Sequence, residues 1–216
     1  MKFEIILNGV KVIKEIPVKW EDVSFEDFLK LDGATELKAA SVFTGISEDD
    51  LRKAEIRNLH LLINSLKFLK HAVPLFKLPK KLGGFDVPTD ISFSSFGQYV
   101  DLKEELDKEK TEIELLKKYP FMCAIYCTQP YDFKEAELKV SSIMKLPCTE
   151  VLAVGNFLLA KLIVSNSTTG GSLLLPDTPL KKLKLALRLL RSRLAFTVRF
   201  FFWKRKHRLT GMNLNV

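Results

Sequence analysis

The stretch KFEIILNGVKVIKEIPV, residues 2–18, decides how the chain begins to fold. Two runs rich in apolar and β-branched residues flank Asn8 and Gly9, a dipeptide that tolerates positive φ at both central positions of a type I′ turn. Pro17 ends the second run, because proline has no N–H to donate to a strand ladder. The stretch therefore predicts a β-hairpin with strands at residues 2–7 and 10–16.

Helical signals dominate the chain after the hairpin. Ser24 stands three residues before Asp27, as at the start of a capping box, and Gly33 supplies a stop. Ser47 begins a second helical region, in which apolar residues recur at helical spacing up to Leu69. Further helices are expected within 95–127, 131–146 and 148–164. The expected fold class is mainly α with an N-terminal β-hairpin, an α+β protein.

Breaks in composition divide the chain into four parts. The stretch LFKLPKKLGGFDVPTD, residues 75–90, is rich in Gly and Pro and predicts a linker or a small irregular hairpin between two halves. We expect an N-terminal half at 1–80, a second helical half at 81–164, a turn-rich linker at 165–178, and a basic amphipathic C-terminal helix and tail at 179–216.

The two halves begin with similar patterns. A strand end of the type Ile-Pro or Val-Pro is followed by a serine and by two phenylalanines three positions apart. The first set is Ile16-Pro17, Ser24, Phe25 and Phe28; the second is Val87-Pro88, Ser92, Phe93 and Phe96. Each pattern predicts a serine-capped helix with both phenylalanines on one buried face that holds the body together. Coincidence between two capped amphipathic helices is the alternative.

The positive charge of the chain is concentrated at its C-terminal end. Residues 179–216 contain 11 of the 34 Lys and Arg residues and no Asp or Glu, whereas residues 1–178 contain 23 basic and 26 acidic residues. A mildly acidic body with a strongly basic tail is typical of a protein with an interaction arm.

The sequence offers little for catalysis or metal binding. It has three histidines and three cysteines, and it contains none of the usual zinc, triad, phosphate-loop or dinucleotide motifs. Cys123 and Cys127 are four positions apart and would share a helix face, but apolar neighbours favour core packing over metal binding. We expect no catalytic, cofactor-binding or metal-binding residues and no enzymatic activity.

No sequence run predicts passage through a membrane or secretion. The most apolar stretch, residues 157–164, is interrupted by Lys161 and is far shorter than the roughly 18 apolar residues that a spanning helix needs. The N-terminal residues lack the pattern of a signal peptide. A cytoplasmic location and the absence of a transmembrane segment are expected.

Four stretches carry a resemblance to a known group of proteins. They are IPVKWEDVSFEDFLKL (16–31), SVFTGISEDDLRKAEI (41–56), ISFSSFGQYVDL (91–102) and YDFKEAELKVSSIMKLPCTEVLAVGNFLLAKL (131–162). Together they resemble tail-assembly-chaperone-like or small head–tail connector-type proteins of tailed phages, in particular phages of Bacteroides-type hosts. The resemblance implies a non-enzymatic assembly or structural role, with phage tail or connector proteins as partners. It also implies a location in the host cytoplasm during assembly or in the virion.

The basic tail is the candidate binding element. On a helix, residues 180–201 form a broad apolar stripe beside a basic side, which suits a groove on a partner or a bilayer interface. We expect nine residues of the basic tail to bind a partner: Leu187, Leu190, Leu194, Arg199, Phe200, Phe201, Trp203, Lys204 and Arg205. Partner binding or self-association is one interpretation; packing on the protein's own core, a membrane surface and, secondarily, nucleic acid are the others.

Overall fold

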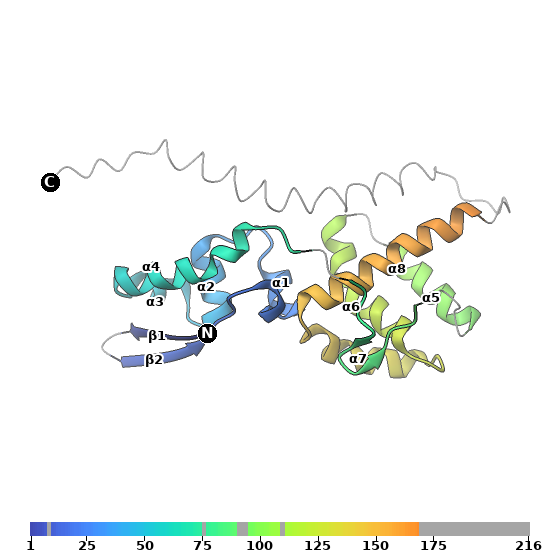
Figure 1. Cartoon of the computed structure of the whole chain (residues 1–216), viewed down its shortest axis with the longest axis horizontal. Helices are drawn as coiled ribbons and strands as arrows, with labels where there is room; N and C mark the ends of the chain where they lie inside the picture. The colour runs from blue at the N-terminus through green and yellow to red at the C-terminus, as the bar shows by residue number, and fades with distance from the viewer. Residues whose placement is uncertain (8–9, 75–76, 90–94, 109–110, 169–216) are drawn as a thin grey trace.

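The computed structural model describes residues 1–7, 10–74, 77–89, 95–108 and 111–168. Within these ranges the protein is mainly helical and carries an N-terminal β-hairpin, which confirms that part of the expected fold class (Figure 1). The expected C-terminal helix lies outside the described residues. No described helix is both long enough and apolar enough to cross a bilayer.

The N-terminal hairpin forms where the Asn8-Gly9 signal places it. Strand β1 (Lys2–Leu7) pairs antiparallel with β2 (Val10–Glu15), with Ile5 opposite Val12. Because side chains alternate along a strand, Phe3 and Ile5 point to one face and are buried there. The N–H of Ile16 donates to the carbonyl oxygen of Met1 over 2.8 Å and closes the open end of the hairpin.

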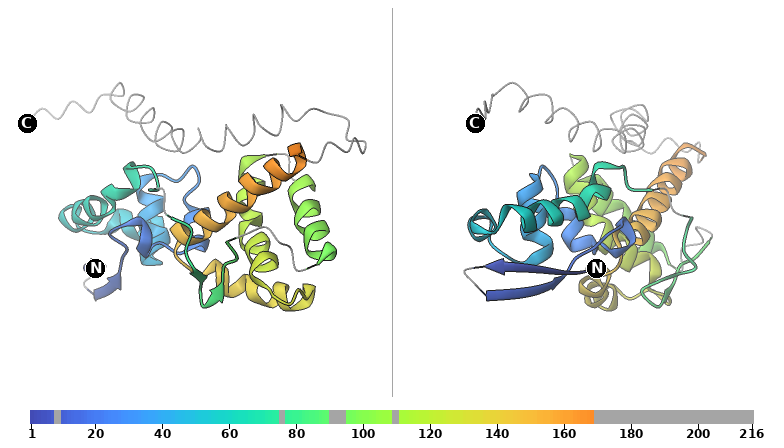
Figure 2. Two further views of the ribbon diagram at one scale, coloured as in Figure 1. Left: turned by 45° about the vertical axis from the view of Figure 1, so that its right-hand side comes forward. Right: turned by 60° about the vertical axis from the view of Figure 1, so that its left-hand side comes forward.

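Four short helices follow the hairpin, and the last three of them contact its strands, as Figure 2 shows. They are α1 (Phe25–Lys30), α2 (Glu36–Thr44), α3 (Glu48–Lys53) and α4 (Ile56–Ser65), with 3-10 turns η1 (Trp20–Asp22) before α1 and η2 (Leu66–Lys70) after α4. The hydroxyls of Ser24, Thr35 and Ser47 cap α1, α2 and α3 by accepting a hydrogen bond from an N–H three residues later. Helix α2 was not expected from the sequence.

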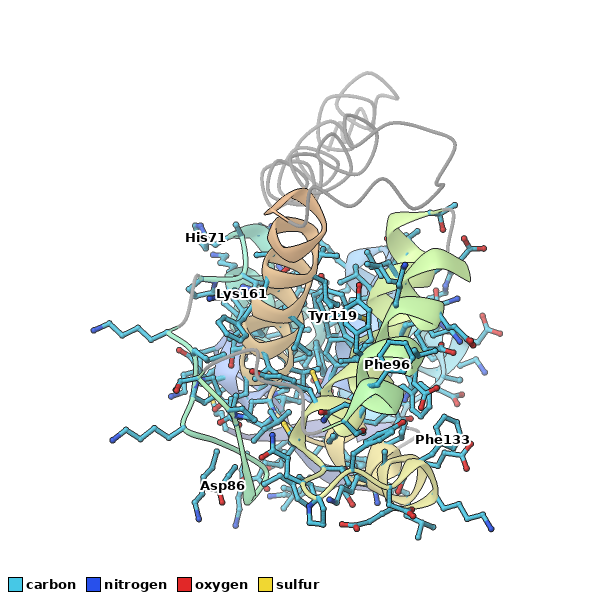
Figure 3. All side chains as sticks on the ribbon, turned by 90° about the vertical axis from the view of Figure 1, so that its right-hand side faces the viewer. His71, Asp86, Phe96, Tyr119, Phe133 and Lys161 are labelled. Atoms are coloured by element: carbon cyan, nitrogen blue, oxygen red, sulfur yellow. The ribbon has the colours of Figure 1, made fainter. Side chains whose placement is uncertain are left out.

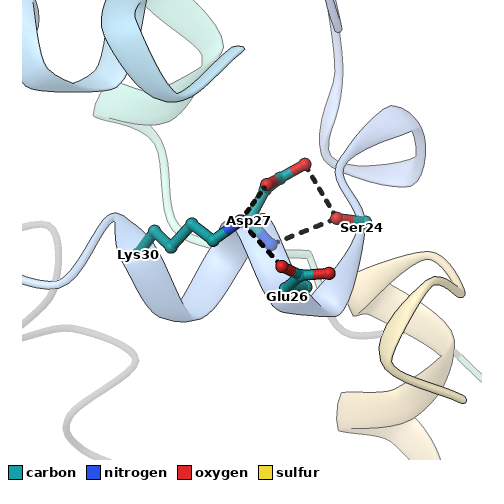
Figure 4. Close-up of polar contacts among 4 residues, drawn as sticks. All are labelled: Ser24, Glu26, Asp27 and Lys30. Atoms are coloured by element: carbon teal, nitrogen blue, oxygen red, sulfur yellow. Dashed lines mark hydrogen bonds and ion pairs between the residues drawn. The ribbon is translucent and has the colours of Figure 1, made fainter. Parts of the chain in front are cut away.

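The cap of α1 contains two linked interactions (Figure 4). Ser24 Oγ accepts from the N–H of Asp27 over 3.1 Å and donates to the Asp27 carboxylate over 2.8 Å. Lys30 in the last turn pairs with Glu26 at 2.9 Å and with Asp27 at 3.2 Å. The sequence prediction of a Ser24 cap is therefore confirmed.

A second, smaller hairpin lies where the sequence predicted a linker or an irregular hairpin. Strands β3 (Lys81–Leu82) and β4 (Phe85–Asp86) are joined by Gly83 and Gly84, whose φ angles are 57° and 94°. The N–H of Val87 donates to the carbonyl oxygen of Lys80 over 3.0 Å. This bond closes the second hairpin in the same way as the bond from Ile16 closes the first.

Four longer helices complete the fold: α5 (Phe96–Lys108), α6 (Glu112–Cys127), α7 (Phe133–Met144) and α8 (Cys148–Thr168). Helix α6 contacts α5, α7 and α8 and supplies the large buried rings of Tyr119 and Tyr126. Gly155 on α8 faces Tyr119, and a Cβ at this position would overlap the ring. The absence of a side chain at Gly155 therefore permits the close packing of α8 on α6.

Helix α1 is joined to α8 by a short stretch of backbone pairing. Ser24 and Pro147 form an isolated antiparallel bridge. Around it, the N–H of Phe25 donates to the carbonyl oxygen of Leu146 and the N–H of Cys148 donates to that of Val23, each over 2.8 Å. Phe25 is fully buried under this contact, which we call the Ser24–Pro147 bridge.

Candidate functional site

The nine tail residues expected to bind a partner cannot be placed in the fold. They are Leu187, Leu190, Leu194, Arg199, Phe200, Phe201, Trp203, Lys204 and Arg205, and all lie beyond Thr168, outside the described residues. Their role stays a prediction. The described part of the chain nevertheless contains a candidate site that the sequence analysis did not assign.

This site is a group of aromatic side chains at the start of α5 and around the α6–α7 connection. We call it the aromatic patch and define it as Phe96, Tyr99, Phe121, Tyr131 and Phe133. Phe96 is 80% exposed and Phe133 is 42% exposed. Figure 3 shows both on the same side of the molecule, Phe96 on α5 and Phe133 on α7.

Ring contacts and one hydrogen bond hold the patch together. Phe96 and Tyr99 lie on one face of α5 with ring centroids 6.5 Å apart. Phe133 meets Phe121 edge to face at 5.7 Å. The hydroxyl of Tyr131 donates to the Asp101 carboxylate and so links the α6–α7 connection to α5.

The Tyr131 hydroxyl is held in its neutral form. Burial, together with the hydrogen bond to Asp101, raises the pKa of Tyr131 above its ordinary value. The raised pKa favours the neutral phenol, which is the form that donates this hydrogen bond. This bond fixes the Tyr131 ring beside Gly97 in the first turn of α5, where a Cβ would lie 3.8 Å from the ring.

The start of α5 corrects the predicted register of the internal repeat. Ser95, not Ser92, caps the helix: its hydroxyl accepts from the N–H of Gln98 over 3.2 Å, and its carbonyl oxygen accepts from that of Tyr99. With Ser95 equivalent to Ser24, Phe96 corresponds to Phe25. The expectation that Phe96 is buried and helps to hold the body is wrong. Phe93 lies outside the described residues.

In the corrected register the two halves match without a gap. The matched pairs are Ile16 with Val87, Pro17 with Pro88, Ser24 with Ser95, Phe25 with Phe96, Phe28 with Tyr99, and Leu31 with Leu102. The closing hydrogen bonds of the two hairpins also correspond. Both halves therefore contain one unit, a hairpin followed by an apolar-proline pair and a serine-capped helix.

The two helix starts differ in what covers them. At the first, residues 146–148 pair with residues 23–25 and leave Phe25 fully buried. At the second, within the described part of the chain, no segment pairs with the backbone of Phe96, and its ring faces solvent. The first helix start is thus covered by backbone pairing, whereas the second has no such cover among the described residues.

The cysteines do not contribute to a reactive or metal-binding site among the described residues. Cys123, Cys127 and Cys148 are buried, which confirms the expected core packing of the first two. Burial raises the pKa of Cys123 well above its ordinary value and raises those of Cys127 and Cys148 to about 12. No group of three or more potential metal ligands occurs in the described ranges.

Sequence reasoning missed the aromatic patch for an identifiable reason. The sequence pattern predicts only that Tyr131 and Phe133 lie in a helical run and that Phe96 is buried. The one available signal was the ungapped match of SFEDFL (24–29) with SFGQYV (95–100). Phe96 is exposed because no other segment of the described ranges covers it, and the local sequence does not encode whether such a segment is present.

Comparison with known proteins gives no assignment. No protein-family model, no curated protein and no solved structure matches the chain.

Proposed function

We propose that this protein is a non-enzymatic assembly factor that holds other polypeptides at the aromatic patch and along its basic C-terminal helix. The observation that carries the proposal is the open helix start at Ser95 and Phe96, whose equivalent at Ser24 and Phe25 is covered by another segment. Large aromatic side chains concentrate binding energy at protein interfaces. A helix start whose aromatic ring is exposed is suited to accept a peptide segment.

The likeness to tailed-phage assembly proteins defines the proposed setting. In that setting the protein is a tail assembly chaperone or a small connector-type subunit, and its partners are phage tail or connector proteins. It acts in the host cytoplasm during assembly or remains in the virion. The charge separation between body and tail supports a binding role, because a strongly basic arm attracts a partner with an acidic surface.

The test is co-expression of the full chain with each tail and connector protein from the same genome. Complex formation is measured by size-exclusion chromatography with mass determination. We expect a defined complex that Phe96→Ser weakens at least tenfold, because a central aromatic anchor is removed. Ile56→Ser is the matched control: Ile56 is 76% exposed on α4, away from the patch. No complex with any of these proteins, or equal effects of both variants, would contradict the proposal.

The eleven basic residues beyond position 178 favour nucleic acid as a second candidate partner. Binding through Arg199, Lys204 and Arg205 would depend steeply on salt, with a slope near 0.9 per phosphate contacted. Titration of labelled DNA at several salt concentrations measures this slope. A flat response would exclude phosphate binding as the function of the tail.

A further inference from the structure

The covered helix start shows what kind of segment fits such a site. Leu146, Pro147 and Cys148 pair with residues 23–25 as one step of antiparallel sheet. Proline is accepted here because the N–H groups used by this pairing belong to Cys148 and Phe25. Thr149 follows and is 3% exposed, and α8 begins immediately at Cys148. The segment that fits is therefore Leu-Pro-x-Thr, whose last two residues are the first two of a helix.

The same pattern occurs once more in the chain. Leu175-Pro176-Asp177-Thr178 repeats the Leu-Pro-x-Thr of residues 146–149, and no third copy exists. It directly precedes residues 179–216, for which the apolar periodicity predicts a helix. The first Leu-Pro-x-Thr segment begins α8, and the second stands before a stretch that the sequence predicts to be helical. Each capped helix start of the repeated unit thus has one candidate segment.

Charge favours the same pairing. Helix α5 carries four acidic and two basic residues, and the segment after Thr178 begins with Lys181, Lys182 and Lys184 and has no acid. A helix that follows Leu175–Thr178 and runs beside α5, as α8 runs beside α1, would place these lysines near the α5 carboxylates. In addition, the Phe96 N–H has no hydrogen-bond partner among the described residues.

We infer that Leu175-Pro176-Asp177-Thr178 pairs with the helix start at Ser95 and Phe96, as residues 146–149 pair with the helix start at Ser24 and Phe25. Ser95 lies opposite Pro176, and the Phe96 N–H donates to the carbonyl oxygen of Leu175. The inference rests on the proposed function and names the segment that occupies its site. In the free protein the pairing covers the helix start at Phe96 and holds the basic helix beside the aromatic patch; a partner segment that replaces residues 175–178 then contacts both.

A disulfide across the inferred pair tests the register. Ser24 and Pro147 are a non-hydrogen-bonded antiparallel pair, in which Cα atoms are about 4.5 Å apart and within disulfide range. We expect Ser95→Cys with Pro176→Cys to form a disulfide in the full chain when oxidised glutathione is added. Non-reducing electrophoresis and peptide mass spectrometry measure it. The native cysteines are buried and do not compete.

Two matched pairs control this experiment. Ser24→Cys with Pro147→Cys is the positive control, because that contact is present in the structure. Ser47→Cys with Pro176→Cys is the negative control: Ser47 is also a helix cap, but on α3. A shift of the monomer band places the segment in the same molecule, and a dimer band places it in a second copy. Crosslinking no greater than in the Ser47 pair, with the positive control formed, overturns the inference.

A second measurement does not depend on the disulfide. Phe96→Cys introduces one exposed thiol, whose reaction with a maleimide reports whether the site is covered. We expect Leu175→Asp in this background to accelerate labelling at least tenfold and Leu209→Asp, elsewhere in the tail, to leave it unchanged. Labelling at the rate of a free thiol in every background overturns the inference.

The two proposals fail in different ways. If the disulfide is absent while Phe96→Ser still dissociates a co-expressed partner, the site binds a foreign segment, and only the inference about residues 175–178 falls. If the disulfide forms while Phe96→Ser leaves partner binding intact, the segment is an internal contact, and the proposed function of the patch falls.

Discussion

At the scale of single residues, the absence of a side chain matters most where two helices meet. Gly155 on α8 lies against the ring of Tyr119 on α6, whose hydroxyl donates to Asn156 Oδ1 over 3.1 Å. The ring is rigid and fully buried, so it cannot move aside as the end of a flexible chain would. The distance between α6 and α8 thus depends on one glycine.

Replacement of this glycine gives a direct stability prediction. Gly155→Ala should lower the free energy of unfolding by about 1–3 kcal/mol through overpacking, although alanine favours helix by about 1 kcal/mol. Gly97→Ala is the control, because a Cβ there meets its nearest atoms at 3.8 Å; this change should be neutral or stabilising. Urea denaturation of both variants measures the difference. Equal stabilisation by the two alanines would show that α6 and α8 are less closely packed than described.

The buried thiols give a second prediction at this scale, for alkaline pH. The folded pKa values of Cys127 and Cys148 are about 12, above the roughly 8.5 of a free thiol. The folded protein therefore holds these protons more tightly than the unfolded chain does. Stability that is complete below pH 8.5 should fall progressively as the pH rises towards 12.

Urea denaturation midpoints measured between pH 7 and 11 should decrease as the pH rises and so report this loss of stability. In the Cys127→Ala variant the slope above pH 9 should be shallower, because one of the linked groups is gone. At pH 8, a thiol reagent should modify the folded protein slowly and the denatured protein at all three cysteines. Rapid modification of the folded protein would contradict the described burial.

At the scale of elements, one buried amide connects two helices. The Gln98 side chain on α5 is fully buried, and its Nε2 donates to the carbonyl oxygens of Ile125 and Tyr126 over 2.8 and 3.4 Å. These carbonyls belong to the last turn of α6, where acceptors lack the usual helical donor four residues later; that of Ile125 also accepts from the Thr128 N–H over 3.4 Å. Gln98 thereby completes the C-terminal end of α6 and fixes the α5–α6 contact.

Loss of the Gln98 amide group should markedly lower the free energy of unfolding. Gln98→Leu leaves two buried carbonyl groups without this donor, so we expect the free energy of unfolding to fall by about 1–3 kcal/mol. Asn64→Leu, on the exposed face of α4, should change it by less than about 0.5 kcal/mol. Thermal unfolding followed by circular dichroism compares the two. An unchanged melting temperature for Gln98→Leu would mean that water replaces the amide.

How far the sequence predicts these elements depends on whether the signal is local. The Asn8-Gly9 turn and the caps at Ser24 and Ser47 are fixed by neighbouring residues, and all were predicted. Helix α2 was missed because its cap at Thr35 follows closely on the Gly33 stop. The predicted register of the repeat was wrong because Ser92 offers the same cap-like pattern as Ser95; the cap bonds from Gln98 and Tyr99 to Ser95 identify the true helix start.

The candidate site was less predictable than the fold for the same reason. Phe25 and Phe96 follow equivalent serines, yet one is buried and the other is exposed. The difference arises from residues 146–148, which are remote in sequence from residues 24 and 25. Periodicity reports which side chains share a helix face, but it does not report whether another segment covers that face.

At the scale of the whole molecule, the N-terminal and C-terminal helices share a core. The Ser24–Pro147 bridge joins α1 to the α7–α8 connection, and the indole of Trp20 donates to the carbonyl oxygen of His71 over 3.2 Å. Cys148 Sγ in turn donates to the Trp20 carbonyl oxygen over 3.3 Å. A boundary near residue 80 remains a prediction, but the contacts cross it.

We therefore expect residues 1–168 to unfold in one cooperative transition. In a full-length Trp203→Phe variant, Trp20 is the only tryptophan and reports on the N-terminal helices, whereas circular dichroism reports mainly on the longer C-terminal ones. The two signals should give the same midpoint in urea, as two-state unfolding requires. Separate midpoints would show that the halves are independent domains.

The Ser24–Pro147 bridge also has a consequence for synthesis on the ribosome. Cys148 and Trp20 are 128 positions apart, so the first helix start emerges long before its covering segment is made. At about 5–20 residues per second, the nascent chain exposes Phe25 for on the order of ten seconds. During that interval the Phe25 ring in the nascent chain is exposed to solvent, as the Phe96 ring is in the folded protein. Early nascent chains of this protein should therefore be clients of ribosome-associated chaperones until α8 has left the exit tunnel.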